Sequence, residues 1–109
     1  MRTIKASDGT PYDAPRHSNV VAVKKVTPEV SRRTTVSLST FQPDGGAEMS
    51  SSDAERVYYV VSGSITVRGK AEEHQLSPGD LVYIAPGEQR SISVNGGTPA
   101  STLVVVVMP

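Results

Sequence analysis

The chain has few residues of the types that most often act as nucleophiles, metal ligands or acid–base groups. There is no cysteine, which excludes a disulfide framework, a thiolate zinc site and a thiol nucleophile. The two histidines are His17, between Arg16 and Ser18, and His74, in the segment EEHQ. An imidazole can serve as an acid or a base near neutral pH. His17 is either a solvated or capping residue or a lid residue with that role, and we expect His74 to lie on a solvated strand face.

The serine run of residues 50–52, followed by Asp53, suggests a nucleophile at first sight. No histidine is adjacent and no elbow motif surrounds the run, so we expect a polar bend between two strands. A relocated metal site built from His17, Glu48, Asp53 and His74 is an alternative, but this spacing matches no compact ligand pattern.

The elements that hold these residues are predicted to be strands. Segments rich in Val, Ile, Thr and Tyr follow one another from Asn19 onward, separated by Pro and Gly. The predicted strands are residues 20–26, 33–41, 47–51, 56–61, 64–68, 72–76, 81–84, 89–94 and 101–108. So many short strands in one small domain predict an all-β sandwich or barrel. Residues 1–18 carry turn formers without periodicity, so we expect an irregular N-terminal arm (1–18) followed by a barrel domain (19–109).

The charge balance and the hydropathy of the chain limit the classes of partner that it can bind. Eleven basic and eleven acidic residues give a formal net charge of zero, which argues against nucleic acid as a partner. No stretch approaches the length of an apolar membrane span, and the polar N-terminus lacks the apolar core of a secretory signal. We therefore expect no membrane partner and a cytoplasmic location.

Turn signals and one apolar run predict how the strands connect. Ser62-Gly63 and residues 68–70 (RGK) are each predicted to form a tight turn of a meander. Residues 102–108 are continuously apolar, which is typical of a strand covered on both faces. One face would pack on the barrel core and the other on a second sheet or a second subunit, because an exposed β-branched surface invites association. A homodimer is therefore expected.

Two segments resemble the paired motifs of the cupin superfamily. Residues 76–87 (LSPGDLVYIAPG) resemble the second motif, in which Gly-Asp opens a strand and Pro-Gly closes it. Residues 56–63 resemble the end of the first motif. Gly79 and Gly87 stand where the chain turns and a positive φ costs little. The resemblance spans roughly residues 34–108 and implies a double-stranded β-helix, or jelly-roll, barrel.

Most cupins bind a divalent metal through three histidines and a glutamate, and the resemblance implies which positions of this chain correspond to those ligands. Here Arg56 occupies the glutamate position, seven residues before Gly63, and Arg90 the second-motif histidine position, three after Gly87. The histidine pair of the first motif falls within the serine run 50–52. A guanidinium neither coordinates a cation nor loses its proton near neutral pH. We therefore expect no metal and no cofactor at this position.

Strand parity then places the two arginines at the barrel mouth with further polar groups. The side chains on the same faces are Glu48, Ser50, Ser52, Tyr58 and Glu88. Buried charges of this kind need partners. In one interpretation, Glu48, Glu55 and Glu88 form salt bridges with the arginines, and this network replaces the metal in a purely structural role. In the other, Arg56 and Arg90 bind a carboxylate or phosphate of a small ligand in bidentate fashion.

The functional prediction is a protein that binds a small anionic, carboxylate-bearing molecule in the barrel. As an enzyme it would be a metal-independent lyase, isomerase or decarboxylase, since related chemistry is common among cupins. Glu48 is then the first candidate acid or base, His17 the second, and Tyr58 the donor to an enolate or oxyanion. The predicted ligand-binding residues are Arg56, Arg90, Ser50, Ser52 and Glu88. The alternatives are a non-catalytic ligand-binding or sensory module, a structural dimer, and a metal-dependent cupin enzyme with relocated ligands.

Overall fold

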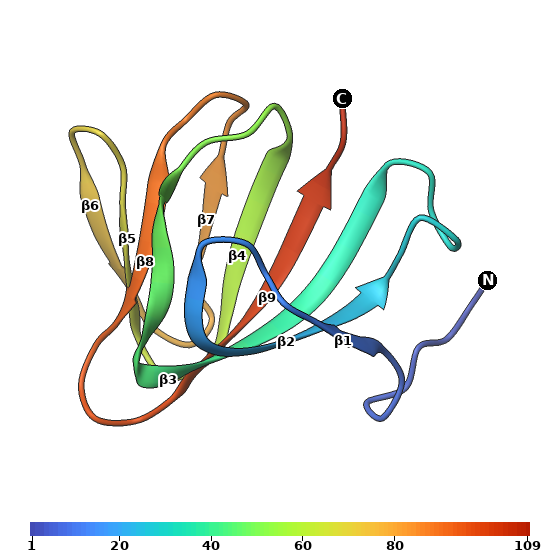
Figure 1. The fold of residues 1–109 in the computed structure, drawn as a ribbon, viewed down its shortest axis with the longest axis horizontal. Helices are drawn as coiled ribbons and strands as arrows, with labels where there is room; N and C mark the ends of the chain where they lie inside the picture. Colours follow the sequence, from blue (N-terminus) through green and yellow to red (C-terminus); the bar gives the residue numbers. More distant parts are fainter.

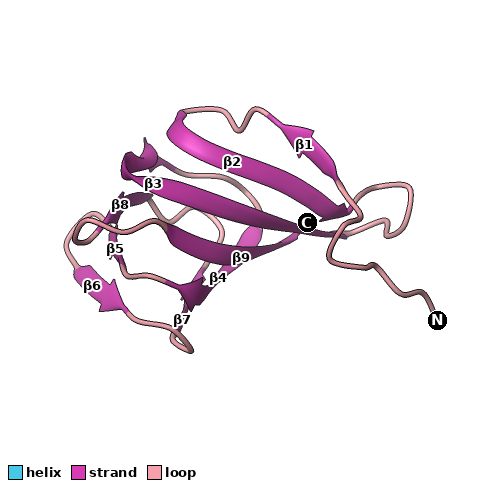
Figure 2. Cartoon of the chain, turned by 90° about the horizontal axis from the view of Figure 1, so that it is seen from below, coloured by secondary structure: helices cyan, strands magenta, loops and turns pink.

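The chain folds entirely from β-strands, in a computed structural model that describes residues 1–109 (Figures 1 and 2). The strands are β1 (Thr10–Tyr12), β2 (His17–Val26), β3 (Thr34–Ser50), β4 (Glu55–Ser62), β5 (Ile65–Arg68), β6 (Glu73–Leu76), β7 (Leu81–Ile84), β8 (Arg90–Val94) and β9 (Ala100–Val107). The structure contains no helix that is long and apolar enough to cross a membrane. The all-β jelly-roll barrel predicted from the sequence is confirmed.

The strands form one antiparallel sheet that curls into a nearly closed barrel. Its order is β6-β5-β8-β3-β9-β4-β7, and β2 with its edge partner β1 lies along the other side of β3. The first part of β3 pairs with β9 and its last part pairs with β8. In Figure 1, β3 therefore sweeps from the β9 side of the barrel to the β8 side. The end strands β6 and β7 do not pair with each other, which leaves an opening between them.

One long strand, β3, replaces two predicted strands. The sequence suggested a break over residues 42–46, yet the extended backbone continues through Gly45 and Gly46. A Cβ at Gly46 would collide with the carbonyl oxygen of Ile92, and a Cβ at Gly45 with that of Asn19. Glycine thus allows the strand to press against β8 and β2 where it changes partner.

The barrel interior follows the predicted alternation. On β4, Tyr58 and Val60 are buried, whereas Tyr59 and Val61 are 39% and 51% exposed. The buried residues of the hydrophobic core are Phe41, Tyr58, Val60, Ile65, Val67, Leu76, Ile84, Ile92 and Ala100. The expected turns at Gly79 and Gly87 have φ values of 93° and 84°. Parity on these strands was therefore a sound basis for placing side chains inside the barrel.

One connection and the N-terminal arm differ from the sequence prediction. Ser62-Gly63 is a turn but not a hairpin, because β4 pairs with β7 and β9 while β5 pairs with β6 and β8. The chain crosses there from one wall of the barrel to the other, whereas residues 68–70 do connect a hairpin. The N-terminal arm is not irregular throughout, since β1 pairs with β2 and β2 begins at His17.

The final strand is covered on one face only. β9 lies between β3 and β4, and Thr102 and Ala100 on its inner face are fully buried. Its outer residues Leu103, Val105 and Val107 remain partly exposed, so no second sheet of this chain covers them. Of the two covers expected for this face, a second sheet is absent from the chain, and a second subunit stays a prediction.

Candidate functional site

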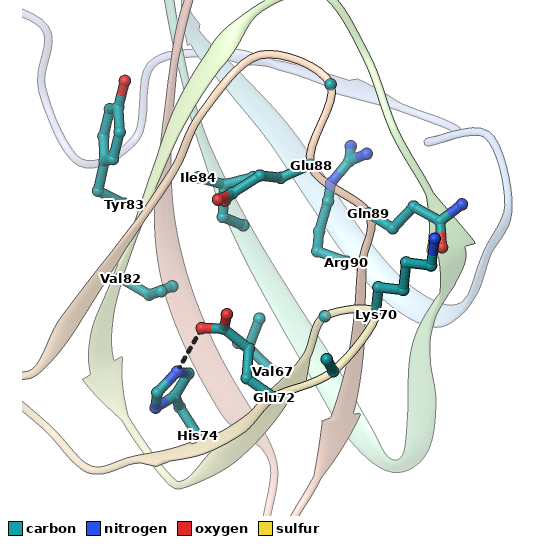
Figure 3. Close-up of a pocket in the computed structure, with 13 residues that line it drawn as sticks. Val67, Lys70, Glu72, His74, Val82, Tyr83, Ile84, Glu88, Gln89 and Arg90 are labelled. Carbon is teal, nitrogen blue, oxygen red and sulfur yellow. Dashed lines mark hydrogen bonds and ion pairs between the residues drawn. The ribbon is translucent and has the colours of Figure 1, made fainter.

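Two cavities lie inside the barrel, one on each side of Arg90. We call the first the inner cavity; it has a volume of about 290 Å³ and is bordered by β1, β2, β3, β4, β8 and β9. The second, the outer cavity, has about 420 Å³ and lies at the opening between β6 and β7 (Figure 3). Arg90 lines both cavities, which makes it the residue that joins them.

Arg90 is buried without a counter-charge. It is the first residue of β8, its exposure is 9%, and its Nε donates a hydrogen bond of 3.2 Å to Tyr58 Oη. Its Nη1 is buried and has no hydrogen-bond partner. Buried polar groups almost always have partners, and a charged group left without one costs several kcal/mol at most sites. The unpartnered nitrogen therefore marks a position where a further acceptor fits.

Arg56 is the second guanidinium of the inner cavity. It is half-buried on β4, and its Nε and Nη2 lie 3.4 Å and 3.2 Å from Ser52 Oγ, which accepts. Burial, and then the charge of nearby Arg90, lower the pKa of Arg56 from its ordinary value. The backbone N–H of Gly87 donates to the Ser52 carbonyl at 2.8 Å, so the two motif segments are tied together beside these arginines.

No carboxylate neutralises these two arginines. The ion pairs of the chain are Arg68–Glu73 and His74–Glu72, both on β5, β6 and the turn between them. No Asp or Glu lines the inner cavity. The interpretation of an internal salt-bridge network is therefore wrong, and the positive charge of the inner cavity is uncompensated.

The structure brings most of the predicted site residues together. The side chains that line the inner cavity include His17, Ser50, Ser52, Arg56, Tyr58 and Arg90. His17 stacks on Phe41 with ring centroids 6.0 Å apart, so the alternative of a residue at the barrel mouth fits better than a solvated histidine. Its Nδ1 lies 2.6 Å from the Pro15 carbonyl oxygen. A carbonyl can only accept, so Nδ1 carries the proton and Nε2 of neutral His17 keeps its lone pair.

The two predicted glutamates lie elsewhere. Glu48 is exposed and lines neither cavity. Ala47 pairs with Ile92 and Ser50 with Arg90, so β3 advances three residues while β8 advances two. This bulge breaks the alternation that placed Glu48 with Ser50. Glu88 is exposed in the outer cavity, and its Oε2 accepts the backbone N–H of Ala85 at 3.2 Å instead of meeting an arginine of the site.

His74 and Glu72 form a pair that the sequence interpretation missed. His74 Nε2 lies 2.8 Å from Glu72 Oε1, and both side chains line the outer cavity together with Lys70 and Gln89 (Figure 3). A signal was present: Leu76 is a core residue, and period-two alternation from Leu76 puts His74 and Glu72 on the inner face of the strand. His74 is solvated, as expected, with a side chain that is 53% exposed, but its strand face is the one that lines the outer cavity.

The residues at the family's metal positions do not fit a divalent cation. Arg56 and Arg90 repel one, and the serine run offers neutral hydroxyls in place of imidazoles. The relocated site also fails, because His17 lines the inner cavity, His74 lines the outer one, and no group of three or more His, Asp or Glu side chains is close enough to share an ion.

The barrel and its two motif segments define the class of protein to which the chain belongs. Residues 37–106 match the family model described as Cupin domain, and the chain is a member of the cupin family.

Among individual proteins, the chain is 35% identical over 111 residues to a Mycobacterium tuberculosis protein named beta-D-galactosidase Rv1717, and the match covers all of this chain and 96% of that protein. Solved structures show the same fold at lower identity. A predicted oxalate decarboxylase from Thermotoga maritima superposes with a TM-score of 0.87 at 16% identity, covering 99% of this chain and 100% of the other. The polyketide cyclase RemF from Streptomyces resistomycificus gives 0.85 at 19% identity, with 100% and 80% covered.

Proposed function

We propose that this cupin binds a small anionic, carboxylate-bearing molecule in the inner cavity, between Arg56 and Arg90. The observation that carries the proposal is the buried Arg90 Nη1 without a partner, on a residue that borders the inner cavity, which no acidic side chain lines. A carboxylate oxygen would satisfy this nitrogen, and its charge would offset the burial and the repulsion by Arg90 that together lower the pKa of Arg56. Ser52, which already accepts from Arg56, lies beside the same position.

The same site offers the parts of a metal-independent lyase, isomerase or decarboxylase. In its neutral form His17 keeps a lone pair on Nε2, and it is the acid or base of this form of the proposal because Glu48 lies outside the cavity. Tyr58 Oη is held by Arg90 and lies in the cavity, where it can donate to a developing oxyanion. A binding module without turnover would need the same arginines and not His17.

Binding is tested with calorimetry and thermal unfolding in a panel of small carboxylates. Wild type should bind one anion per chain, and Arg90→Met should lose the ligand-induced rise in Tm. Arg68→Met is the matched control, because Arg68 is exposed and pairs with Glu73 away from the inner cavity. Equal ligand-induced stabilisation of wild type and Arg90→Met would remove the proposal, and His17→Gln separates binding from turnover once a substrate is found.

A second candidate function is glycoside hydrolysis in the outer cavity. Two observations favour it: the full-length similarity to a protein named as a β-galactosidase, and the presence of both Glu72 and Glu88 in the outer cavity. Most glycosidases work with a pair of carboxyl groups flanking the scissile bond. Hydrolysis of p-nitrophenyl β-D-galactopyranoside should then be lost in Glu72→Gln and in Glu88→Gln but kept in Glu73→Gln, whose side chain pairs with Arg68 instead. No hydrolysis by wild type would eliminate this candidate.

We also propose that the outer face of the β2-β3-β9-β4-β7 wall joins two copies of the chain. Paired apolar residues cross this wall in register, in the rows Val23-Leu38-Leu103-Tyr59-Leu81 and Val36-Val105-Val57-Tyr83. Stable interfaces bury about 800 Å² on each partner, a scale that two such rows and their neighbours can supply. Light scattering should give twice the chain mass of 11.5 kDa, and Tyr59→Lys should give the monomer. Gln75→Lys, on the exposed face of β6, is the control, and a monomeric wild type would refute the dimer.

A further inference from the structure

The inner cavity holds more positive charge than one carboxylate needs. Besides Arg56 and Arg90, Arg16 and Lys24 line it, and no acidic residue does. Neither Arg16 nor Lys24 forms an ion pair within the chain. Four cationic side chains around one cavity of about 290 Å³ therefore face a space without any negative group.

Lys24 stands on a different strand from Arg56 and Arg90, which lie on β4 and β8. Pairing runs from Lys24 to Ser37, from Ser37 to Val104 and from Val104 to Tyr58, so Lys24 on β2 lies three strands from Tyr58 on β4. Strands lie about 4.8 Å apart, so the two backbones are roughly 14 Å apart along the curved sheet. A lysine side chain spans part of that distance, and a molecule of a few carbon atoms fills the rest.

The ammonium of Lys24 has a defined place. It lies 4.7 Å from the centre of the Tyr12 ring, a cation–π contact, and Tyr12 also lines the inner cavity. Tyr12 Oη in turn donates to Ser37 Oγ at 3.4 Å. An aromatic face attracts the ammonium without neutralising it, so Lys24 stays available to an anion.

Arg16 sits at the same rim in an unusual backbone conformation. Its φ is 59°, in the left-handed region that arginine seldom adopts, and its carbonyl oxygen accepts the N–H of Glu48 at 2.9 Å. Strained backbone of this kind is often kept where it positions a functional side chain. Here it holds an arginine at the edge of a cavity that already contains two.

We infer that the ligand carries two anionic groups, one bound by Arg56 and Arg90 in the interior and the other by Lys24 and Arg16 at the rim. This inference rests on the proposed function and names its ligand class: a short, linear dicarboxylate or a phosphorylated carboxylic acid. The interior pair supplies most of the affinity, because Arg90 is buried and Arg56 is half-buried. The rim pair is exposed, so each of its contacts contributes a few-fold in affinity and selects the ligand by length.

The test is a series of α,ω-dicarboxylates from malonate to adipate, each compared by calorimetry with the monocarboxylate of equal chain length. Wild type should bind one intermediate length about tenfold more tightly than its monocarboxylate. Lys24→Met and Arg16→Gln should each lower dicarboxylate affinity about three- to fivefold and leave monocarboxylate affinity unchanged. Lys5→Met, an exposed lysine outside both cavities, is the control. The ligand 3-phosphoglycerate, measured in parallel, shows whether the rim prefers phosphate to carboxylate.

The outcomes separate the two proposals. Equal affinity for dicarboxylates and monocarboxylates in wild type overturns the second anionic site and leaves the binding proposal standing. Unchanged dicarboxylate affinity in folded Lys24→Met and Arg16→Gln also overturns the second anionic site and leaves the binding proposal standing. If no anion of the series binds wild type, the proposed function fails and this inference fails with it. Thermal unfolding of Lys24→Met and Arg16→Gln establishes that each variant is folded before its affinity is read.

Discussion

Arg90 should be a residue whose removal stabilises the empty protein and abolishes ligand binding. The variant Arg90→Met keeps the apolar stem of the side chain and removes the guanidinium. It eliminates the buried Nη1 that lacks a partner and the repulsion between Arg90 and Arg56. It also removes the hydrogen bond that Arg90 Nε donates to Tyr58 Oη.

The magnitude follows from these contributions. A buried unpartnered polar group costs about 1–3 kcal/mol, and more when charged, whereas a hydrogen bond contributes about 1 kcal/mol net. We therefore expect Arg90→Met to raise the free energy of unfolding by about 1–2 kcal/mol. In a domain of this size that corresponds to a rise in Tm of about 5–10 °C.

Saturating ligand should reverse the order of the two proteins. At a ligand concentration about 100 times Kd, wild type gains about 2.7 kcal/mol and the variant gains nothing. Differential scanning calorimetry with and without ligand measures both values, and Arg68→Met should stay within about 0.5 kcal/mol of wild type in each condition. If ligand-free Arg90→Met melts well below wild type, the Arg90 guanidinium stabilises the ligand-free fold. That result would contradict the claim that the guanidinium lacks a partner until an anion binds.

Three further outcomes are expected. Gly46→Ala should destabilise the fold by about 2 kcal/mol or more in a urea titration, because the new Cβ would strike the Ile92 carbonyl; a shift within about 0.5 kcal/mol would contradict the close approach. The hydrogen bond that Tyr83 Oη donates to Glu55 at 2.6 Å raises the pKa of Tyr83. Its protonated form is thus favoured in the folded state, so this contact stabilises the protein below about pH 10 and is lost at more alkaline pH. Ultraviolet titration should show one tyrosine that ionises late and returns to the ordinary range in Glu55→Gln; no change in that variant would assign the shift elsewhere. Dialysis against EDTA should leave Tm and anion affinity unchanged, and a loss of either would reveal a metal that the arginines were not expected to allow.

The fold could be predicted because its signals are local. Alternating apolar residues on β4 and the glycines at positions 79 and 87 each reflect backbone requirements that act within a few residues. Strand pairing could not be read in the same way. Ser62-Gly63 looks like a hairpin turn, but whether flanking strands pair depends on β8 and β9, which lie far along the chain.

The candidate site was predicted where alternation is regular and missed where it is not. Arg56, Tyr58 and Arg90 lie on strands without irregularity at these positions, and all three line the inner cavity. Glu48 was misplaced because a bulge in β3 shifts its direction, and nothing in the adjacent residues announces a bulge. The solvation of His74 was predicted from its charged neighbours, but its place in the outer cavity was missed, because it depends on which strand face is turned inward, as the buried Leu76 shows.

The place of Lys24 and Arg16 at the rim of the inner cavity could not be predicted from the sequence. They reach the inner cavity because β1 and β2 fold back along β3 and bring the arm to the barrel mouth. That contact joins positions far apart in the sequence. The chain before β2 shows no periodicity that would predict it.

The central claim is that this cupin binds an anion at the position where most cupins hold a metal cation. The most direct test is a high-resolution crystal structure of the protein with its best-binding anion. We expect an anion within hydrogen-bonding distance of both Arg56 and Arg90, with Arg90 Nη1 as one of its donors. A divalent metal at this position, or two guanidinium groups paired with carboxylates of the chain itself, would contradict the central claim.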